Sequence, residues 1–428
     1  MAITPVVNNK VELIAFRAAE AANYLRIGSR KYFKDQLVGK RNGQKYTFVV
    51  RDAGSFQEGM DLSGTGASNL TERSVEKELQ LGNIVIETSL LNKVTDIDWD
   101  DDVAKINGPK LIHGVVRKAV DSDLGLQNTA FVGTGFQPLF KAQNFLKTVS
   151  DAPSYGFINP MINSILSSNG QSFTPAEASD VFSGSGLVGK LSDVEYRANQ
   201  YMPMVSVESG LDTALKTATA ITYESDVIVG SGPQAVHYGP ALKFAGVTGH
   251  VIPKGYVIWI KGVYATDICG DKTSALKAFI AHSDSYDDGT DTYMLIRELH
   301  FSGEGTKTLC DKNGAELTEA QLEGLVDSNA KIKAAVDFLP AGDYFGGFVR
   351  IDGSMEFETV DQLDASNADT KKETVEGLTV IENRAVDVMK GTNTTRWTVV
   401  SMSGIVDERE VAYVLVRDKV INEVRTNP

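Results

Sequence analysis

The sequence has little cysteine, histidine and tryptophan. Its 428 residues include two cysteines, Cys269 and Cys310, five histidines and three tryptophans. Two cysteines exclude a disulfide-stapled scaffold and favour a reducing, cytoplasmic setting, although one bridge between them stays open. Five histidines spread along the chain argue against a histidine-rich metal site.

Long apolar runs are also absent. No stretch reaches about 18 consecutive apolar residues, so we expect no membrane-spanning helix. Residues 1–16 have neither the basic segment nor the long apolar segment of a secretory signal, so we expect no such signal. Apolar residues make up 42% and charged residues 23%, which is typical of a folded globular protein. At about 150 residues per domain, the length predicts two or three domains.

Basic residues are the minority charge. The chain has 42 basic and 56 acidic residues, a net charge of −14. This balance argues against general nucleic-acid binding, which needs clustered lysine and arginine. Residues 1–45 are the exception, with nine basic residues against Glu12, Glu20 and Asp35.

The first predicted element is a helix over Val11–Leu25. Its apolar positions follow a helical period and form one face: Val11, Ile14, Ala18, Ala21, Ala22 and Leu25. An amphipathic helix must bury that face, so we expect it to dock either on its own domain or on a neighbour.

A long polar loop follows between two predicted strands. The strands are Tyr46–Val50 and Val75–Thr88, and the second is either one strand or a pair of strands that would turn at Gly82 and Asn83. Residues 51–74 between them are rich in glycine, and structureless loops of that length are uncommon inside compact domains. We therefore predict a projecting hairpin that reaches a partner.

The remaining pattern is mixed, so the predicted fold class is α+β. Residues 96–126 read as a helix in two pieces, interrupted at Gly108 and Pro109. Further predicted features are listed in chain order: alternating helical and extended pieces over 137–168, a capping box at Thr174–Glu177, a mostly β segment over 221–351, a helix over Thr318–Leu325 or on to Val336, a polar loop over 359–376, and strands at Leu378–Ile381, Trp397–Val400 and Val411–Val416.

One motif is close to a phosphate-binding loop. Residues Gly184–Lys190 satisfy GxGxxG, but Leu191 occupies the position where serine or threonine would hold magnesium. No buried strand precedes the motif and no apolar helix follows it, and a phosphate cradle needs both. We interpret it as a glycine-rich turn.

No other pattern indicates a catalytic or metal site. The aspartates at 96, 98 and 100–102 fit a solvated helix start, and those at 284, 287, 288 and 291 fit a β-turn. His113 is interpreted as a packed or capping residue. We predict no catalytic residue, no metal ligand and no cofactor, and therefore not an enzyme.

The order of parts favours a self-assembling structural protein. An N-terminal helix, a projecting hairpin, a long helix and an apparently inserted β segment provide surfaces for neighbours. Two alternatives remain. One is an enzyme or ligand-binding protein with a deep apolar pocket built from distant residues. The other is a different virion part, such as a decoration or tail-tube protein, although those are generally shorter.

Four short motifs occur in an order that resembles one family. They are Gln57–Leu62, which reads Q-E-G-M-D-L; Asn159-Pro160 after the aromatic strand ending Phe157-Ile158; Lys254-Gly255 leading into the strand Tyr256–Ile260; and the closing strands named above. The chain resembles the major capsid proteins of tailed bacteriophages with the Hong Kong 97-like fold. It is most similar to the short-tailed (podovirus) branch with a telokin-like insertion domain, although Tyr256 stands where an aspartate is usual.

The resemblance implies a domain plan. Its segments are an N-arm at 1–35; a peripheral domain at 36–133 with an E-loop at 51–74 and a spine helix at 97–126; an axial domain at 134–220 and 338–392; an inserted β domain at 221–337; and C-terminal strands of the peripheral domain at 393–428. The family implies self-assembly through arm and loop exchange into hexamers and pentamers of an icosahedral shell, by way of a procapsid.

The resemblance also implies partners and interface residues. Expected partners are further copies of the chain, a scaffolding protein and a portal protein, around double-stranded DNA that is enclosed without sequence-specific binding. The expected location is the virion, after assembly in the host cytoplasm, with no covalent crosslinking and no major processing. The predicted assembly interface comprises Glu12, Glu20, Arg51, Asp52, Gln57, Glu58, Asp61, Glu72 and Arg73. Glu12 and Glu20 are proposed for scaffold contact.

Overall fold

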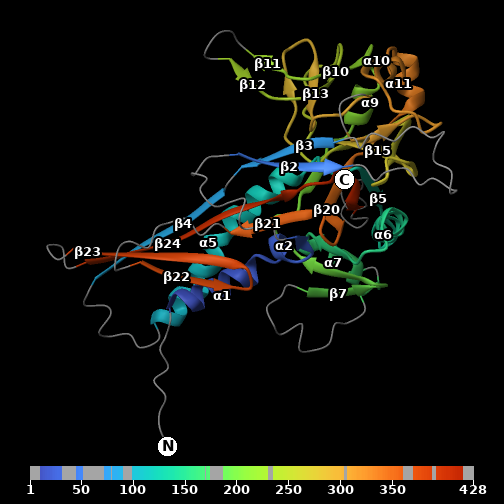
Figure 1. Cartoon of the computed structure of the whole chain (residues 1–428). Helices are drawn as coiled ribbons and strands as arrows, with labels where there is room; N and C mark the ends of the chain where they lie inside the picture. Colours follow the sequence, from blue (N-terminus) through green and yellow to red (C-terminus); the bar gives the residue numbers. More distant parts are fainter. Residues whose placement is uncertain are drawn as a thin grey trace, which may run out of the picture.

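A computed structural model describes residues 10–30, 45–51, 72–78, 80–89, 99–168, 170–173, 187–229, 235–302, 306–359, 370–387 and 392–417. Two larger sheets with their helices form the lower body in Figure 1, and a β-rich region lies above them. The mixed α+β composition predicted from the sequence is confirmed.

The first sheet has six strands around one long central strand. Its order is β1-β21-β24-β23-β22. Strand β4 pairs with the edge of β24 that is opposite to β23. The strands are β1 (Ser29–Arg30), β4 (Gln80–Ser89), β21 (Met355–Thr359), β22 (Thr370–Val375), β23 (Leu378–Asp387) and β24 (Thr392–Ile405). All of these pairs are antiparallel except β1 with β21.

Helix α5 (Trp99–Asp123) packs along this sheet as one continuous helix. The predicted break at Gly108 and Pro109 is therefore wrong. A proline inside a helix costs about 3 kcal/mol, but each fully buried leucine, isoleucine or valine contributes roughly 1.5–3 kcal/mol. The turns after Pro109 bury such residues in succession, and this outweighs the lost hydrogen bond: Leu111, Ile112, Val115, Val116 and Val120.

The N-terminal segment, residues 10–30, lies on its own chain. Helix α1 (Lys10–Ala21) packs on α5, β22 and β23, and the short helix α2 (Asn23–Arg26) packs on α5 and β21. The predicted apolar face is confirmed, because all its members are buried except the partly buried Ala21. A Cβ at Gly108 would lie 2.6 Å from Cβ of Arg17, so glycine permits the close approach of the two helices.

The second sheet has seven strands and its own helices. Its order is β5-β25-β20-β6-β8-β7, with β9 also paired to β20. The strands are β5 (Thr129–Gly133), β6 (Ser154–Ile158), β7 (Leu187–Leu191), β8 (Val194–Ala198), β9 (Met204–Val207), β20 (Gly342–Ile351) and β25 (Val411–Arg417). Helices α6 (Gln137–Val149) and α7 (Pro160–Ser168) bury apolar faces against it in a separate core, as the alternating pattern predicted.

The β-rich region, residues 221–338, contains three further sheets. Among the described residues its strands pair only with one another. They are β10 (Ile221–Glu224), β11 (Ile228–Val229), β12 (Val236–His237), β13 (Ala241–Phe244), β14 (Val257–Thr266), β15 (Lys272–Ile280), β16 (Tyr286–Asp287), β17 (Thr292–Leu295), β18 (Leu309–Cys310) and β19 (Val336–Phe338). The short helix α9 (Leu211–Leu215) leads into the region.

The predicted helix after residue 317 is two short helices. Thr318 and Gln321 form a capping box that opens α10 (Glu319–Gly324). A second helix, α11 (Asn329–Ala335), runs directly into β19. The longer run to Val336 is therefore interrupted, although its end is helical.

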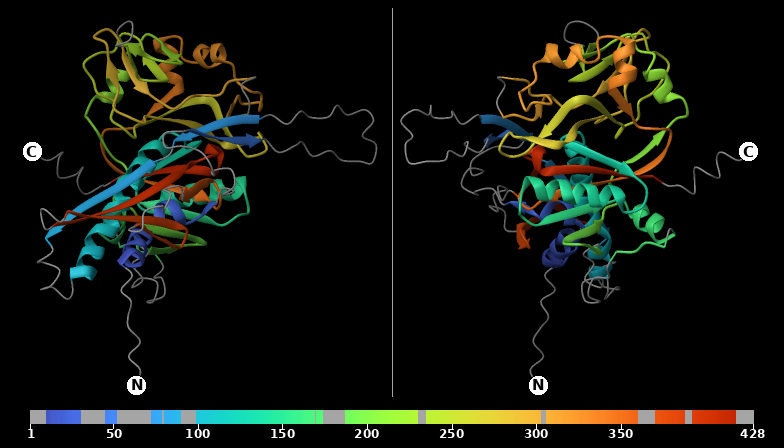
Figure 2. Two further views of the ribbon diagram at one scale, coloured as in Figure 1. Left: turned by 60° about the vertical axis from the view of Figure 1, so that its left-hand side comes forward. Right: turned by 90° about the vertical axis from the view of Figure 1, so that its right-hand side faces the viewer.

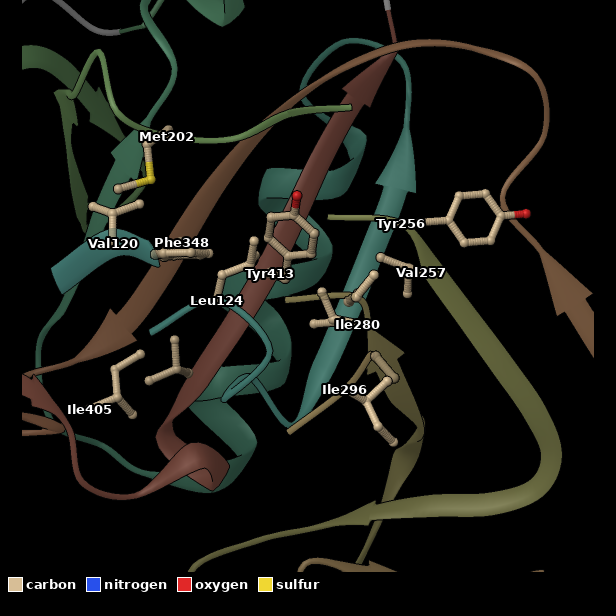
Figure 3. Close-up of a cluster of buried hydrophobic side chains, with 14 of the residues drawn as sticks. Val120, Leu124, Met202, Tyr256, Val257, Ile280, Ile296, Phe348, Ile405 and Tyr413 are labelled. Atoms are coloured by element: carbon tan, nitrogen blue, oxygen red, sulfur yellow. The ribbon is translucent and has the colours of Figure 1, made fainter. Parts of the chain in front are cut away.

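The β-rich region shares a core with the body. Side chains from α5, β25 and β20 meet side chains from β14 and the end of β15 in one buried cluster (Figure 3). Gly255 has φ +84°, and a Cβ there would lie 2.7 Å from Cγ2 of Val205 on β9. The chain enters β14 at this contact, so the region is packed onto the body rather than tethered by a linker.

Strands β2 (Lys45–Arg51) and β3 (Glu72–Glu78) form an antiparallel hairpin, with Arg51 opposite Glu72. Figure 2 shows this blue hairpin beneath the β-rich region. The pairing of the two strands is confirmed, and residues 52–71 lie outside the described residues. The predicted turn at Gly82 and Asn83 is wrong, because both residues lie within β4. A Cβ at Gly82 would lie 2.6 Å from the Leu111 carbonyl oxygen, so this glycine lets β4 approach α5.

The closing strands require a second correction. Only β20 of the segment 338–392 belongs to the seven-stranded sheet, whereas β21, β22 and β23 belong to the six-stranded sheet. The segment 393–428 is divided in the same way, because β24 lies in one sheet and β25 in the other. The predicted polar loop over 359–376 contains β22, and residues 360–369 lie outside the described residues. Hydrophobic pattern gives strands but not their partners, which explains both errors.

Candidate functional site

A buried arginine holds the end of the N-terminal segment. Arg350 on β20 is fully buried and donates to the carbonyl oxygens of Tyr24 at 2.7 Å and Ile27 at 2.6 Å. Its guanidinium carbon lies 4.6 Å from the ring centre of Phe157 and 5.1 Å from that of Tyr24. Burial lowers the pKa of Arg350 from its ordinary value.

Tyr24 connects this segment to α5 and β24. Its hydroxyl donates to Oδ2 of the buried Asp123 at 2.7 Å, and Asp123 Oδ1 accepts from the Ile405 N–H at 2.9 Å. Burial and the neighbouring Asp123 charge raise the pKa of Tyr24 well above its ordinary value, so the hydroxyl keeps its proton. One carboxylate therefore joins three segments that are distant in sequence.

The C-terminal end of α5 is capped by the β-rich region. Arg297, just after β17, donates to the carbonyl oxygens of Asp121 at 3.1 Å, Ser122 at 2.8 Å and Leu124 at 3.2 Å. Lys254, just before β14, forms an ion pair with the Asp121 side chain. Both cations lie where the partial negative charge of a helix end favours them. We call Asp121, Gly125, Lys254, His282 and Arg297 the α5 joint.

His282 is the residue of the α5 joint whose side chain ordinarily changes charge near neutral pH. The backbone N–H of His282 donates to the Leu295 carbonyl at 3.0 Å. A Cβ added at Gly125 would lie 3.4 Å from the Cβ of His282. Burial, followed by the charges of Arg297 and Lys254, lowers the pKa of His282 to about 4. The imidazole is therefore neutral at pH 7.

A second joint is a buried ion pair. Lys277 on β15 lies 2.9 Å from Glu408 in the 3-10 turn η2 (Glu408–Glu410), and both side chains are less than a tenth exposed. The Lys277 ammonium also donates to Asn128 Oδ1 at 3.1 Å, and the Asn128 amide donates to the Thr266 carbonyl at 2.7 Å. This network ties the β-rich region to the seven-stranded sheet.

Asn159, in the motif Asn159-Pro160, links a strand to a helix. Its side chain caps α7 by accepting from the Met161 N–H at 3.0 Å and donates to the Met202 carbonyl at 3.0 Å. Pro160 takes the first helical position, where no N–H is needed. The predicted strand-to-helix transition is confirmed, and the asparagine is explained by its two-sided bonding.

The predicted interface residues are placed in part. Glu12 is exposed on α1, while Glu20 is half-buried and pairs with Arg17 at 2.9 Å, so the structure does not bring the two carboxylates together as one site. The backbones of Arg51, Glu72 and Arg73 lie at the end of the β2–β3 hairpin where residues 52–71 connect the two strands. The other predicted members lie outside the described residues: Asp52, Gln57, Glu58 and Asp61.

The phosphate-loop resemblance has a structural explanation. Residues Leu187–Leu191 form β7, which pairs with β8, and Lys190 forms an ion pair with Glu195 at 3.0 Å. A strand therefore replaces the glycine-rich turn that we predicted, while residues 184–186 lie outside the described residues. The capping box predicted at Thr174–Glu177 also falls outside them.

The other weak candidates have structural roles. Asp287 and Asp288 accept backbone N–H groups around Gly289, which confirms the predicted turn. His113 packs edge-on against Tyr201 with ring centres 5.6 Å apart, as a packed residue should. Cys269 and Cys310 do not form a disulfide with each other.

The described part of the chain contains neither a candidate metal site nor a candidate membrane-spanning helix. No group of three or more His, Cys, Asp or Glu side chains there could hold a metal ion. No helix there is long and apolar enough to cross a membrane. Hydrogen bonds lower the pKa of five carboxyl groups there: Asp193, Asp226, Asp288, Asp311 and Asp327.

The most heavily bonded polar residues were not predicted from the sequence. Arg350, Arg297 and Lys277 each lie in or beside a strand and bind partners more than 100 positions away. The local signal was a charged residue, Arg350, in a mainly apolar strand that also contains Asp343, because a charged residue is rarely buried without partners.

Comparisons with known proteins find similarity only at the level of structure. No family model matches the chain, and no curated protein matches it. Solved structures that it resembles are bacteriophage capsids and heads. The capsid of Ralstonia phage GP4 is 7% identical, with 92% of this chain and 87% of that chain covered and a TM-score of 0.43.

Two further structures are similar at the same level. The mature capsid of bacteriophage PhiM1 is 7% identical, with coverages of 91% and 86% and a TM-score of 0.38. The head of Helicobacter pylori bacteriophage KHP40 is 8% identical, with coverages of 92% and 87% and a TM-score of 0.36. Because these scores are low, the functional argument below rests on the chain's own elements.

Proposed function

We propose that this chain is the major capsid subunit of a tailed bacteriophage, with a structural rather than an enzymatic role. In this proposal it has the Hong Kong 97-like fold of the podovirus branch, with a telokin-like insertion. It assembles by arm and loop exchange into the icosahedral shell around double-stranded DNA. Assembly takes place in the host cytoplasm, and the finished protein resides in the virion.

One observation carries the proposal. The chain forms, in the order that the resemblance implied, an N-terminal helical segment, the β2–β3 hairpin, the long helix α5, a separate sheet with two helices, and a β-rich region whose strands pair internally. Of the motif positions, Asn159 bonds within the part built on the seven-stranded sheet, and Gly255 lies at a tight contact between that part and the β-rich region. This order supports a coat subunit more directly than any single residue does.

The domain plan is proposed with revised bounds. Helix α5 and the six-stranded sheet would form the peripheral domain, which now includes β21 to β24. The seven-stranded sheet with α6 and α7 would form the axial domain, which now includes β25. The β-rich region would be the inserted domain. These assignments follow sheet membership instead of continuous stretches of sequence.

The β2–β3 hairpin and its connecting loop are proposed to contact a neighbouring copy of the chain, as the E-loop of the domain plan. Its strands end opposite one another at Arg51 and Glu72, and twenty residues, 52–71, connect them. A connection of that length is far longer than pairing of the strands requires, because two residues suffice for a hairpin. Many weak contacts made by such loops add up in a shell through valency.

Scaffolding and portal proteins are proposed as further partners. Glu12 is exposed on α1, and Glu20 retains some exposure beside Arg17. Replacing both glutamates by alanine should weaken binding of the scaffolding protein, with Glu12→Ala accounting for most of the loss. Equal scaffold binding by the wild type and the double variant would remove these residues from the interface.

The assembly test compares three full-length proteins with and without the scaffolding protein. The first is the wild type. The second replaces residues 52–71 by Asn-Gly, which closes the hairpin between Arg51 and Glu72 with a two-residue turn. The third contains the same twenty residues in shuffled order, as a control for length and composition.

Negative-stain electron microscopy and sedimentation distinguish the outcomes. We expect uniform hollow shells from the wild type, and folded but unassembled protein from the shortened and shuffled variants. A wild type that stays monomeric at high concentration with scaffold would contradict the capsid proposal. Normal shells from the shortened variant would instead contradict the role of the loop.

A further inference from the structure

The α5 joint brings two cations and one neutral imidazole to the same helix end. Arg297 donates to three carbonyl oxygens of that end, and Lys254 pairs with Asp121. Gly125 has φ +92°, and a Cβ there would lie 2.9 Å from Cγ of Arg297 and 3.4 Å from Cβ of His282. The backbone at Gly125 therefore packs closely against both side chains.

The charges around His282 come from several elements. Arg297 and Lys254 both act on the imidazole, and both disfavour its protonation. The acidic groups are engaged with those cations or with other donors, so they do not pair with His282: Asp121 binds Lys254, Asp123 accepts from Tyr24 and Ile405, and Asp284 accepts from the Lys254 N–H at 2.8 Å. A proton on His282 would place a third positive charge beside two others.

We propose that the α5 joint is a pH-sensitive latch, which holds the β-rich region on the end of α5 while His282 is neutral and loosens when His282 gains a proton. The partial negative charge of the helix end can be shared by two cations but is weak compared with a full charge. The latch therefore responds to acid through repulsion within the joint, not through loss of a salt bridge.

The direction of the effect follows from linkage. In the closed joint the pKa of His282 is about 4, and in an opened, hydrated joint it returns to about 6.5. Between these values the open form binds more protons than the closed form, so acid favours opening. A histidine with this difference makes opening roughly twentyfold more frequent at pH 5 than at pH 7.

Hydrogen exchange on the unassembled full-length chain tests the latch. The probes are the amides of Leu124, Leu126 and His282, whose hydrogen bonds lie in the joint. Protection factors, corrected for the pH dependence of intrinsic exchange, are compared at pH 7 and pH 5. We expect a roughly twentyfold fall in the wild type and a much smaller change in His282→Gln, which cannot be protonated. His237→Gln, which alters an exposed histidine, should behave as the wild type.

Two results would overturn the proposal. One is a fall in protection of the same size in His282→Gln and wild type. The other is unchanged protection in the wild type at pH 5. An NMR titration of the His282 ring in the wild type gives a decision even when the variant fails to fold: a pKa below 5 supports the latch, and one near 6.5 contradicts it. Because every measurement uses single subunits, the outcome is independent of whether shells form.

Discussion

The Tyr24 hydroxyl donates a 2.7 Å hydrogen bond to the Asp123 carboxylate, although the two residues are 99 positions apart. The bond joins the N-terminal segment to the end of α5, and Asp123 continues it to the backbone of β24. The N-terminal segment, which is the proposed arm, is thus held near its C-terminal end by contacts within the subunit.

Removing the Tyr24 hydroxyl should destabilise the subunit. Tyr24→Phe keeps the ring in its contacts with Phe157 and Arg350 but leaves a buried carboxylate oxygen without its donor. Such a loss costs about 1–3 kcal/mol of unfolding free energy, measured by urea denaturation. Tyr201→Phe, which removes a hydroxyl that accepts from the exposed Gln200 side chain, is the matched control and should change stability by under about 0.5 kcal/mol. Equal effects of both variants would contradict the assignment.

Arg350 should control how firmly the N-terminal segment is held. Arg350→Lys keeps the charge, but an ammonium cannot reproduce the planar fork that reaches two carbonyl oxygens and stacks on two rings. We expect faster tryptic cleavage at Arg17 and Arg26 in this variant, followed by gel electrophoresis. The exposed Arg396→Lys is the control and should be cut at the wild-type rate. Unaltered cleavage of the Arg350 variant would show that other contacts suffice.

The Lys277–Glu408 pair should show strong coupling. Lys277→Met alone removes the cation beside a buried carboxylate and should cost about 3–5 kcal/mol, whereas the double variant with Glu408→Leu should recover much of that loss. A double-mutant cycle from urea denaturation measures the coupling free energy. Additive losses would mean that the two side chains act independently.

Stability should fall in mildly acidic solution through His282. Its pKa in the folded chain, about 4, is below that of an unfolded chain, so the unfolded state binds more protons as pH drops below about 6.5. The unfolding free energy should decrease progressively from pH 6.5 to pH 4. Urea denaturation at several pH values should give a shallower decrease for His282→Gln, and identical slopes would argue against this source.

The two cysteines should differ in reactivity. Cys269 is exposed, whereas burial raises the pKa of the Cys310 thiol and reduces its thiolate fraction near neutral pH. A maleimide reagent at pH 7 should label one site in the native protein, identified by peptide mass as Cys269. Two labels should appear only after denaturation, and rapid native labelling of Cys310 would contradict its burial.

Much of the secondary structure could be predicted from local pattern. The spacing of Val11, Ile14 and Ala18 predicted a buried helix face, and the alternation of apolar residues predicted the closing strands. Errors arose where packing overrode a local rule. Pro109 remains inside α5, and Gly82 lies within β4, because both positions adjoin closely packed neighbours. Local propensity carries no information about such neighbours.

The candidate site was predicted far less well, for a reason of chemistry. Arg350, Arg297 and Asp123 look like ordinary charged residues in sequence, because a charge shows no sign of its partner until the chain has folded. The local part of the role of Asn159, its position at a helix start, was recognisable, whereas its bond to the Met202 carbonyl was not. Partners more than 100 positions apart in the sequence leave no local pattern from which their contact could be predicted.

The sequence by itself determined the element types, the order of the parts and the surplus of acid, because periodicity and composition are local properties. The tertiary structure decided which sheet each strand joined, that the N-terminal segment docks on its own chain, and that three cations of the β-rich region bind the body. These outcomes depend on contacts between distant segments, where burial of apolar faces and pairing of buried charges select one arrangement.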